Sequence, residues 1–234
     1  MSQSNFSDAD KAFFKDGYKM AMEATKDPNN QQQFLSVVKQ QYQAMDGLID
    51  ALSAQATRQQ VNIDCRKGCD WCCHQPIYGI SHEFVYLWKH LQEKYSEEEL
   101  KPILSQAFKN YQKRGRLKDQ ELLSSKAPCP LLKDGACMAY EARPMACRIY
   151  LSMSEKSCRT FYDNPNDPSN HPALLEFPLR AGQMMNEGFN KGLKMSSLAG
   201  REFLMEEGLL IAHNNGEAIS DDDISKNPLF NVND

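Results

Sequence analysis

Apolar residues recur every three or four positions along most of the chain, which is the spacing of one helix face. The clearest run lies in residues 32–59, where the apolar positions step by four and three residues in turn: Val38, Tyr42, Met45, Ile49 and Leu52. Only about two heptads are present, whereas a coiled coil needs roughly three to four. We therefore expect this helix to pack against the body of the protein.

Further helices are predicted on both sides of this run. Ser7 or Asp8 is expected to cap a helix ahead of it, and Asp27-Pro28 is expected to end that helix. Downstream, Ser81 is a candidate N-cap, since its hydroxyl can accept a hydrogen bond from the first turn of a helix. That helix would carry an apolar face made by Phe84, Leu87, Trp88 and Leu91.

The remaining helices follow the same kinds of signal. A capping box that begins at Ser96 predicts a helix that ends near Gly115, and Pro102 inside it predicts a kink or a later start. Residues 172–193 and 196–213 are predicted to form two more helices. Strands and helices do not alternate as they would in a parallel sheet. We expect a mainly α fold: a helical domain with a cysteine-rich metal-binding core and at most one small β-hairpin.

The chain divides into three zones. Residues 1–60 form an N-terminal helical segment, residues 61–160 a cysteine-cluster metal-binding domain, and residues 161–234 a C-terminal helical segment. The last zone ends in a loose acidic tail that contains Asp221-Asp222-Asp223. At 234 residues, the three zones are expected to form one compact unit.

Charge and hydropathy argue against two classes of protein, those that bind nucleic acid and those that span a membrane. The chain has 27 basic and 31 acidic residues, a net charge of −4, which argues against a protein that mainly binds nucleic acid. No apolar run approaches the roughly 18–20 residues of a membrane helix, so no membrane partner is expected. The N-terminus lacks the basic-then-apolar layout of a signal peptide. We therefore expect a cytoplasmic protein, in a compartment where thiols stay reduced.

The cysteines are the strongest chemical signal in the sequence. There are eight, all between residues 65 and 158: Cys65, Cys69, Cys72, Cys73, Cys129, Cys137, Cys147 and Cys158. Clustering of this kind in a reducing compartment indicates metal binding or redox chemistry, because structural disulfides are rare there. All eight are candidate metal ligands.

The first group places four thiols within nine residues. Gly68 allows the tight turn that such a loop needs, and Arg66 favours the thiolate form of its neighbours. Cys72 and Cys73 are adjacent and are expected to point in different directions. One would be a ligand, and the other a ligand to a second metal, a packing residue or a reactive thiol. His74, which follows the pair, is expected to be an outer residue rather than a ligand.

The second group begins with a hairpin signal. Asp134-Gly135 between apolar residues predicts a tight turn. A three-residue loop at 133–135 would place Cys129 and Cys137 on one face, and a two-residue loop would place them on opposite faces. Metal binding favours the longer loop.

Two arginines flank the next cysteine. Pro144 is expected to open a short helix that places Cys147 near its positive end. Arg143 and Arg148 are predicted to contact the bound centre, because guanidinium groups donate hydrogen bonds to sulfur. The alternative is that both arginines form ordinary structural ion pairs.

These motifs together resemble a known family. The chain is similar to the YkgJ-type cysteine cluster family over about residues 62–160, through Cys65-x3-Cys69-x2-Cys72-Cys73, Cys129-Pro130-Leu131-Leu132, Asp134-Gly135-x-Cys137, Tyr140-Glu141-x-Arg143-Pro144-x-x-Cys147-Arg148 and Cys158. The resemblance implies a zinc- or iron-chelating domain with a cysteine-ligated centre. Flagellin N-methylase, which methylates lysines on flagellin, is similar in its cysteine motif, but no residue here identifies a methyl-donor pocket.

The spacing favours an iron–sulfur cluster over zinc as the cofactor. Iron–sulfur clusters often draw three ligands from a tight run and one from a distant cysteine, and the wide spacing of the second group is unlike a zinc knuckle. The spacing of Cys65, Cys69 and Cys72 also matches the radical S-adenosylmethionine signature, but the chain lacks the strand–helix alternation of those enzymes.

Three functional hypotheses follow. The first is a metal-binding module for electron handling or structure, with an iron–sulfur centre or, alternatively, zinc. The second is a protein-modifying enzyme of the flagellin N-methylase kind. The third is a sensor in which Cys72 or Cys73 is a reactive thiol. A protein partner is left open by all three.

Overall fold

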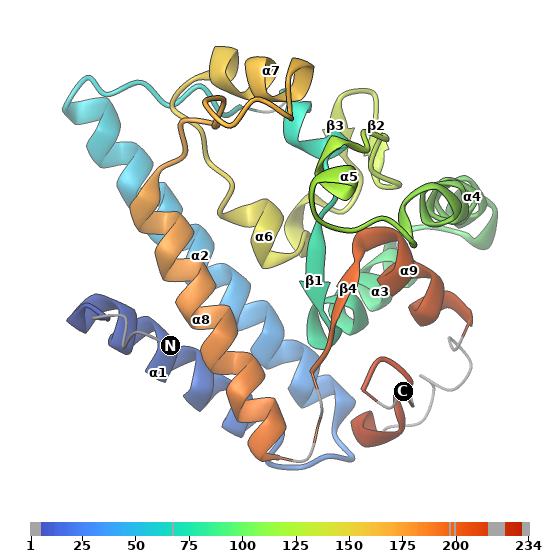
Figure 1. The fold of residues 1–234 in the computed structure, drawn as a ribbon. Coiled ribbons are helices and arrows are strands. Elements are labelled where there is room, and N and C mark those ends of the chain that lie inside the picture. Colours follow the sequence, from blue (N-terminus) through green and yellow to red (C-terminus); the bar gives the residue numbers. More distant parts are fainter. Residues whose placement is uncertain (1–5, 67, 197, 199, 215–222, 231–234) are drawn as a thin grey trace.

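The computed structural model describes residues 6–66, 68–196, 198, 200–214 and 223–230. Helices dominate this part of the chain, which confirms the mainly α class (Figure 1). The helices are α1 Asp8–Ala24, α2 Gln31–Arg58, α3 Ser81–Lys94, α4 Glu97–Arg114, α5 Asp119–Ser124, α6 Met145–Arg148, α7 Glu155–Asp163, α8 Glu176–Met195 and α9 Met205–Asn214. Short 3₁₀ helices are η1 Trp71–His74, η2 Tyr140–Ala142 and η4 Ile224–Lys226. None of the described helices is long and apolar enough to cross a bilayer.

Two small antiparallel sheets accompany the helices. Strand β2 Leu132–Lys133 pairs with β3 Ala136–Cys137 in the predicted hairpin. Strand β1 Tyr78–Ile80 pairs with β4 Glu202–Leu204, so residues more than a hundred positions apart lie side by side. The second pair is not a hairpin, and the sequence analysis did not predict it.

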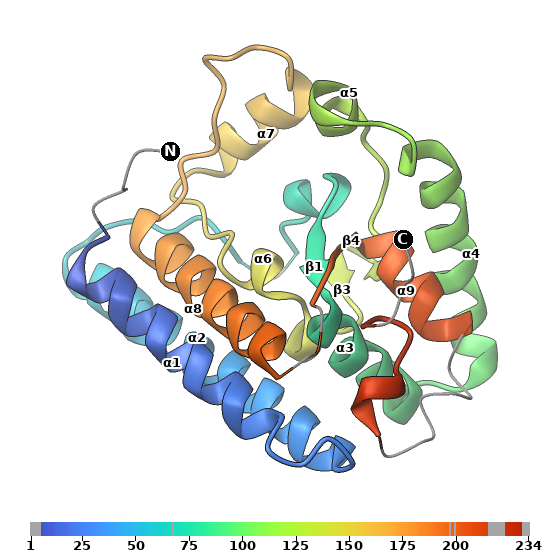
Figure 2. The same cartoon turned by 60° about the horizontal axis from the view of Figure 1, so that its bottom comes forward.

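Three long helices form one side of the molecule. Helices α1, α2 and α8 lie next to one another in both ribbon views (Figures 1 and 2). Glycines let the backbones of α1 and α8 touch: a Cβ atom on Gly188 would lie 2.0 Å from the Phe14 carbonyl oxygen. The apolar face predicted for α2 is used here, since Val38, Tyr42 and Met45 are buried in the core.

The opposite side is built around α3. Its predicted apolar face is buried, with Phe84, Leu87 and Leu91 fully enclosed. Helix α9 packs against α3 and α4, and the β1–β4 pair lies beside them (Figure 2). The segment with the cysteines spans the space between this side and the three long helices.

Several predicted helix ends are confirmed, and one is wrong. Ser7 and Ser96 cap α1 and α4 through complete capping boxes, and α4 runs through Pro102 without a later start. Ser81 is not an N-cap; it is the first residue of α3. Its hydroxyl donates to the Leu229 carbonyl and accepts from the Arg201 N–H, so it is occupied by the C-terminal segment.

The C-terminal helices also differ from the prediction. The first spans Glu176–Met195 rather than 172–193, with Pro178 in its first turn. The helix predicted at 196–213 is wrong in its first half, because Phe203 and Leu204 belong to β4 and the helix begins only at Met205. Pairing with β1, a contact distant in sequence, outweighs the local helical pattern there.

The acidic tail is partly packed. Asp223 accepts a hydrogen bond from the Ser225 N–H and caps η4, and Ile224, Leu229 and Phe230 are buried in the core. The loose tail expected there is therefore wrong for residues 223–230. Asp221 and Asp222 lie outside the described residues.

The glycine contact predicts opposite effects of two Gly→Ala substitutions. Gly188→Ala forces a methyl group into the Phe14 backbone and is expected to lower the free energy of unfolding by about 3 kcal/mol. Gly47→Ala is the matched control, because Gly47 is exposed inside α2 with no atom within 4 Å of its Cβ position. It is expected to gain about 0.5–1 kcal/mol from helix propensity. Denaturant unfolding of both variants checks this, and equal effects would contradict it.

A buried histidine predicts acid sensitivity. His82 is fully enclosed against Phe189, at 4.4 Å between ring centres, and burial lowers its pKa to about 3. Below pH 6.5 the unfolded chain takes up a proton that the folded chain refuses, so stability falls as the pH drops towards 3. His82→Phe removes this effect. The variant is expected to lose about 2 kcal/mol less than the wild type between pH 7 and pH 5 in urea unfolding. Identical losses would contradict the buried neutral state.

Candidate metal centre

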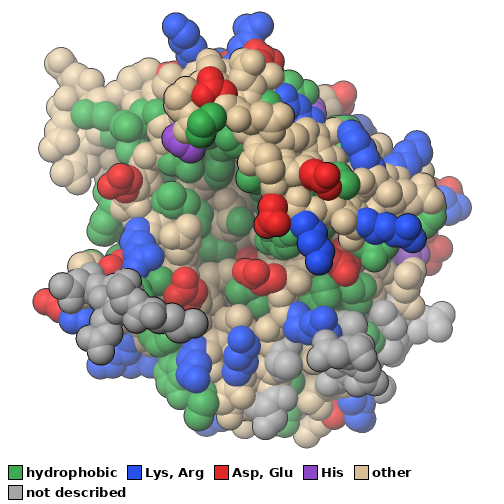
Figure 3. All heavy atoms as spheres, in the orientation of Figure 1, with side chains coloured by type: hydrophobic (Ala, Val, Ile, Leu, Met, Phe, Trp, Pro, Cys, Tyr) green, Lys and Arg blue, Asp and Glu red, His purple; other side chains and the backbone are tan. Residues whose placement is uncertain are grey.

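The cysteines reach one region from several elements. Cys65 follows α2, and Cys69, Cys72 and Cys73 lie in the turn around η1. Cys129 precedes the hairpin, Cys137 lies in its strand β3, Cys147 lies in α6 and Cys158 in α7. Seen from the side of Figure 1, apolar side chains, a class that includes cysteine, gather in a hollow near the middle of the face below α7 (Figure 3). All eight thiols are free, with no disulfide among them.

Backbone hydrogen bonds join the two cysteine groups. The Cys129 N–H donates to the Cys73 carbonyl at 2.7 Å, and the Cys65 N–H donates to the Ser152 carbonyl at 3.3 Å. The Ala127 N–H donates to the His74 carbonyl at 3.1 Å. The segment after α5 therefore runs beside η1, and the segment after α6 runs beside Cys65. These hydrogen bonds bring together chain segments that lie more than fifty residues apart in the sequence.

Several sulfurs accept backbone hydrogen bonds. The backbone N–H groups of Trp71, Leu131 and Ala139, each two residues further along the chain, lower the pKa of Cys69, Cys129 and Cys137, respectively, against the larger effect of burial. The Ser152 N–H donates to Cys65 Sγ at 3.2 Å. A hydrogen bond to the charged form of a group stabilises that form, so these amides favour thiolates. The local backbone is arranged as a thiolate site requires.

Burial has the opposite effect on the thiols. It is the largest cause that raises the pKa of Cys129, to about 12, and it also raises the pKa of Cys137 and Cys147. For Cys72 the first cause is a hydrogen bond with Cys73, followed by burial. Without a compensating cation these groups are neutral thiols at neutral pH. A metal ion supplies that compensation, because it deprotonates a coordinating thiol outright.

Repulsion between thiolates identifies two sets of neighbours. After burial, Cys72 and Cys158 raise the pKa of Cys65, and Cys65 and Cys72 raise that of Cys69. These four form the first set. Cys129, Cys137 and Cys147 form the second set, since Cys129 and Cys137 raise the pKa of Cys147.

Cys72 borders both sets. Its charge also raises the pKa of Cys137 and of Cys147. Cys73, its hydrogen-bonded neighbour, is tied to Cys129 through the backbone. Among the described residues, no three His, Cys, Asp or Glu side chains converge on a single ion position. The donor set fits a soft or borderline metal, but ligation by three or more thiols needs their side chains to rotate inward.

The hairpin corrects one prediction. Leu132 pairs with Cys137 and Lys133 with Ala136, so the loop has two residues, not three. Asp134 and Gly135 both have positive φ, 51° and 73°, the conformation that a tight Asp-Gly hairpin turn requires. A two-residue loop was expected to place Cys129 and Cys137 on opposite faces of the hairpin, but that argument does not apply to Cys129. The chain turns at Pro130 through a Leu132 N–H to Cys129 carbonyl bond, so Cys129 lies outside the strand alternation.

Arg143 faces the second set. It is the guanidinium whose charge lowers the pKa of Cys137 and Cys147, against the larger effect of burial. Its Nη1 donates to the Tyr140 carbonyl at 2.6 Å, and its guanidinium lies 3.8 Å from the centre of the Tyr140 ring. This places a positive charge beside the thiols, where it favours thiolates.

Arg148 instead ties the cysteine segment to α2. Its guanidinium is fully buried, pairs with Asp46 and lies 4.3 Å from the centre of the Tyr42 ring. Nη2 donates to the carbonyls of Glu141 at 2.7 Å and Arg143 at 3.4 Å. The Arg148 side chain thus closes the turn between η2 and α6.

Sequence reasoning missed a third arginine. Arg114 is the last residue of α4, yet it is 1% exposed and lies 3.7 Å from Glu206. Its Nη2 donates to the carbonyls of Ser125 at 2.7 Å and His74 at 2.8 Å. Arg114 therefore holds the backbone at His74 and the backbone at Ser125 together, shortly before Cys129 in the chain. No local sequence signal distinguishes it from the exposed Lys113 beside it.

Aromatic rings surround His74 at the first set. Tyr162 of α7 contacts Trp71 at 5.3 Å and His74 at 5.6 Å between ring centres, and Lys126 lies 4.1 Å from the Tyr162 ring centre. His74 Nδ1 lies 3.1 Å from the Asp70 carbonyl. That nitrogen is occupied by the backbone, as suits an outer residue.

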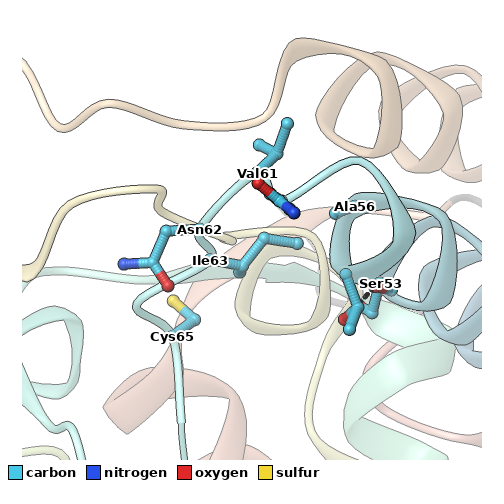
Figure 4. Close-up of a pocket in the computed structure, with 8 residues that line it drawn as sticks. Ser53, Ala56, Val61, Asn62, Ile63 and Cys65 are labelled. Atoms are coloured by element: carbon cyan, nitrogen blue, oxygen red, sulfur yellow. Dashed lines mark hydrogen bonds between the residues drawn. The ribbon is translucent and has the colours of Figure 1, made fainter.

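Two cavities border the cysteines. One of about 420 Å³ lies beside the end of α2 and is lined by Ser53, Ala56, Val61, Asn62, Ile63 and Cys65, among others (Figure 4). The other, of about 470 Å³, lies between α4 and the hairpin and is bordered by Ile103, Met138 and Cys129. Each cysteine set therefore has one member beside a cavity.

One comparison with known proteins gives a match. Residues 64–167 match the model of the CxxCxxCC family, described as a "putative zinc- or iron-chelating domain". No curated protein and no solved structure is detectably similar to the chain. The match confirms the resemblance to a cysteine-cluster family, and the chain is a metal-binding cysteine protein in this region.

The two arginines predict different effects on stability. Arg148→Met leaves two carbonyls without their donor and removes the closer of the two arginines that pair with Asp46, the other being Arg143 at 3.8 Å. It is expected to cost about 2–4 kcal/mol of unfolding free energy. Arg143→Met is the matched variant and is expected to cost less than about 1.5 kcal/mol, because its direct bonds lie nearer the surface. Urea unfolding of the metal-free variants measures both. A larger loss for Arg143→Met would contradict this division of roles.

Proposed function

We propose that the metal-chelating cysteine domain holds an iron–sulfur centre through thiolates of Cys65, Cys69, Cys72, Cys73, Cys129, Cys137, Cys147 and Cys158. The observation that carries the proposal is the set of backbone N–H groups aimed at Cys65, Cys69, Cys129 and Cys137. Hydrogen bonds to sulfur are a main means by which proteins tune iron–sulfur centres. When bound, such a centre accepts or donates single electrons.

The donor chemistry supports iron–sulfur over zinc. Every candidate donor is a thiol, and the adjacent His74 has its Nδ1 beside a backbone carbonyl. Arg143 adds a positive charge beside the second set, which stabilises an anionic thiolate assembly. The chain's own residues would hold the centre, neutralise part of its charge and limit its contact with water. Zinc remains the alternative cofactor.

The two thiol sets suggest two centres. Four cysteines form the first set, and three form the second, which Cys73 completes through its contact with Cys129. Cys72 and Cys73, whose side chains are hydrogen-bonded to each other rather than pointing apart as expected, would then ligate neighbouring centres. Because an iron–sulfur centre transfers single electrons, we assign electron handling as the role, with a purely structural role as the alternative.

The first experiment measures what is bound. Protein purified without oxygen is expected to be brown, with iron and acid-labile sulfide in comparable amounts and visible absorption that bleaches on reduction. A colourless protein with about one or two zinc ions and no sulfide would reject the iron–sulfur centre and favour a structural or sensing role.

Cysteine variants test whether the two sets act separately. Cys69→Ser and Cys147→Ser each remove one ligand from a different set, and each is expected to lose about half of the iron. His74→Gln is the control, and it is expected to keep the full metal content. Complete loss of iron in both cysteine variants would indicate one shared centre. Unchanged iron in both would remove these residues from the ligand set.

A further inference from the structure

Glu83 is a buried carboxylate whose role lies outside the cysteine motifs. The residue is 1% exposed, in the first turn of α3. Its Oε1 accepts the Met145 N–H at 2.5 Å and the Tyr42 hydroxyl at 3.2 Å. Its Oε2 accepts the Ile80 N–H at 2.8 Å and the Asn186 amide at 3.2 Å. Four donors therefore surround one acid.

The four donors come from different parts of the fold. Ile80 precedes α3, Tyr42 lies in α2 and Asn186 in α8, so three of the bonds fix Glu83 within the helical framework. The fourth goes to Met145, the first residue of α6. Hydrogen bonds to a carboxylate are shorter and stronger than those between neutral groups. The Met145 backbone is thus attached firmly to the framework.

The bond between Glu83 and Met145 matters because the short helix α6 also contains Cys147. Cys147 lies two residues after Met145 in a helix of only four residues, so its position follows that of Met145. Tyr42, another Glu83 partner, lies close enough to Cys147 to be affected by its charge. The remaining members of the second set are held by other contacts: Cys129 by the Cys73 backbone and Cys137 by the hairpin.

We propose that Glu83 is a positioning residue for the second cysteine set, and that its bond to the Met145 N–H fixes Cys147 for metal binding. The inference rests on the proposed function in one respect, namely that Cys147 ligates a metal. A buried acid that only stabilised the fold would affect unfolding but would not affect metal binding in particular. The two roles can therefore be separated by experiment.

The test titrates Co²⁺ into the metal-free protein and follows the thiolate-to-cobalt absorption. Glu83→Gln keeps the size of the side chain but turns an amide NH₂ towards two of the four donors. It is expected to weaken Co²⁺ binding at the second set by about 10- to 100-fold, the usual cost of losing an outer partner of a metal ligand. The spectrum of the remaining complex is expected to show fewer thiolate bands.

Ser81→Ala is the matched control. Ser81 is also buried in the first turn of α3, but its hydroxyl bonds to Arg201 and Leu229, away from α6. It is expected to lower stability while Co²⁺ affinity stays within about twofold of the wild type. Equal Co²⁺ binding by Glu83→Gln and Ser81→Ala would overturn the positioning role.

The same bond can be removed from the other side if Glu83→Gln does not fold. Met145→Pro deletes the N–H donor at a first helical position, where proline is tolerated, and Met145→Ala controls for the lost side chain. Met145→Pro is expected to weaken Co²⁺ binding more than Met145→Ala. Equal binding by the two would overturn the proposal. A wild type without any thiolate-to-cobalt bands would overturn the proposed function as well.

Discussion

Buried thiols that lie close together cannot all ionise without a cation among them. Burial raises the pKa of Cys129, Cys137 and Cys147, and each neighbouring thiolate raises it further. Backbone amides at Cys65, Cys69 and Cys129 act in the opposite direction, since they stabilise the thiolate form. Burial outweighs these amides, so the thiols are neutral without a cation. A bound metal would supply the positive charge that favours the thiolate form.

The framework acts on the cysteine segment through a few buried polar residues. Arg148 pairs with Asp46 of α2, Arg114 clamps the segments around His74 and Ser125, and Glu83 holds the start of α6. Each lies within the family match and also bonds to a helix outside it: Arg148 to Asp46 of α2, Arg114 to Glu206 of α9 and Glu83 to Tyr42 of α2. The helices at both ends of the chain are therefore part of the site's support, although they carry no metal-ligating motif.

Local signals in the sequence were enough for most of the long helices and for the metal-binding class of the cysteine domain. The steps of the apolar face predicted α2, an N-cap candidate at Ser7 predicted the start of α1, and the capping box at Ser96 predicted that of α4. The clustering of eight cysteines predicted a metal-binding domain that the family match confirms. Contacts between distant segments were not predictable in this way. Phe203 and Leu204 follow a helical pattern yet pair with β1, and Ser81 has the composition of an N-cap yet bonds to the C-terminal segment. Arg114 and Glu83 look like ordinary surface charges in sequence, but both are buried against distant segments, Arg114 beside Glu206 and Glu83 beside Tyr42.

The central claim is that sulfur alone ligates the metal of this domain. X-ray absorption at the edge of the native metal, in protein purified without oxygen, tests it most directly, because the first shell reports ligand type and distance. The account predicts a shell of sulfur atoms at about 2.3 Å, with a second shell of iron if the centre is an iron–sulfur cluster. A first shell dominated by nitrogen or oxygen at about 2.0–2.1 Å would contradict it, and would move the metal away from the cysteines.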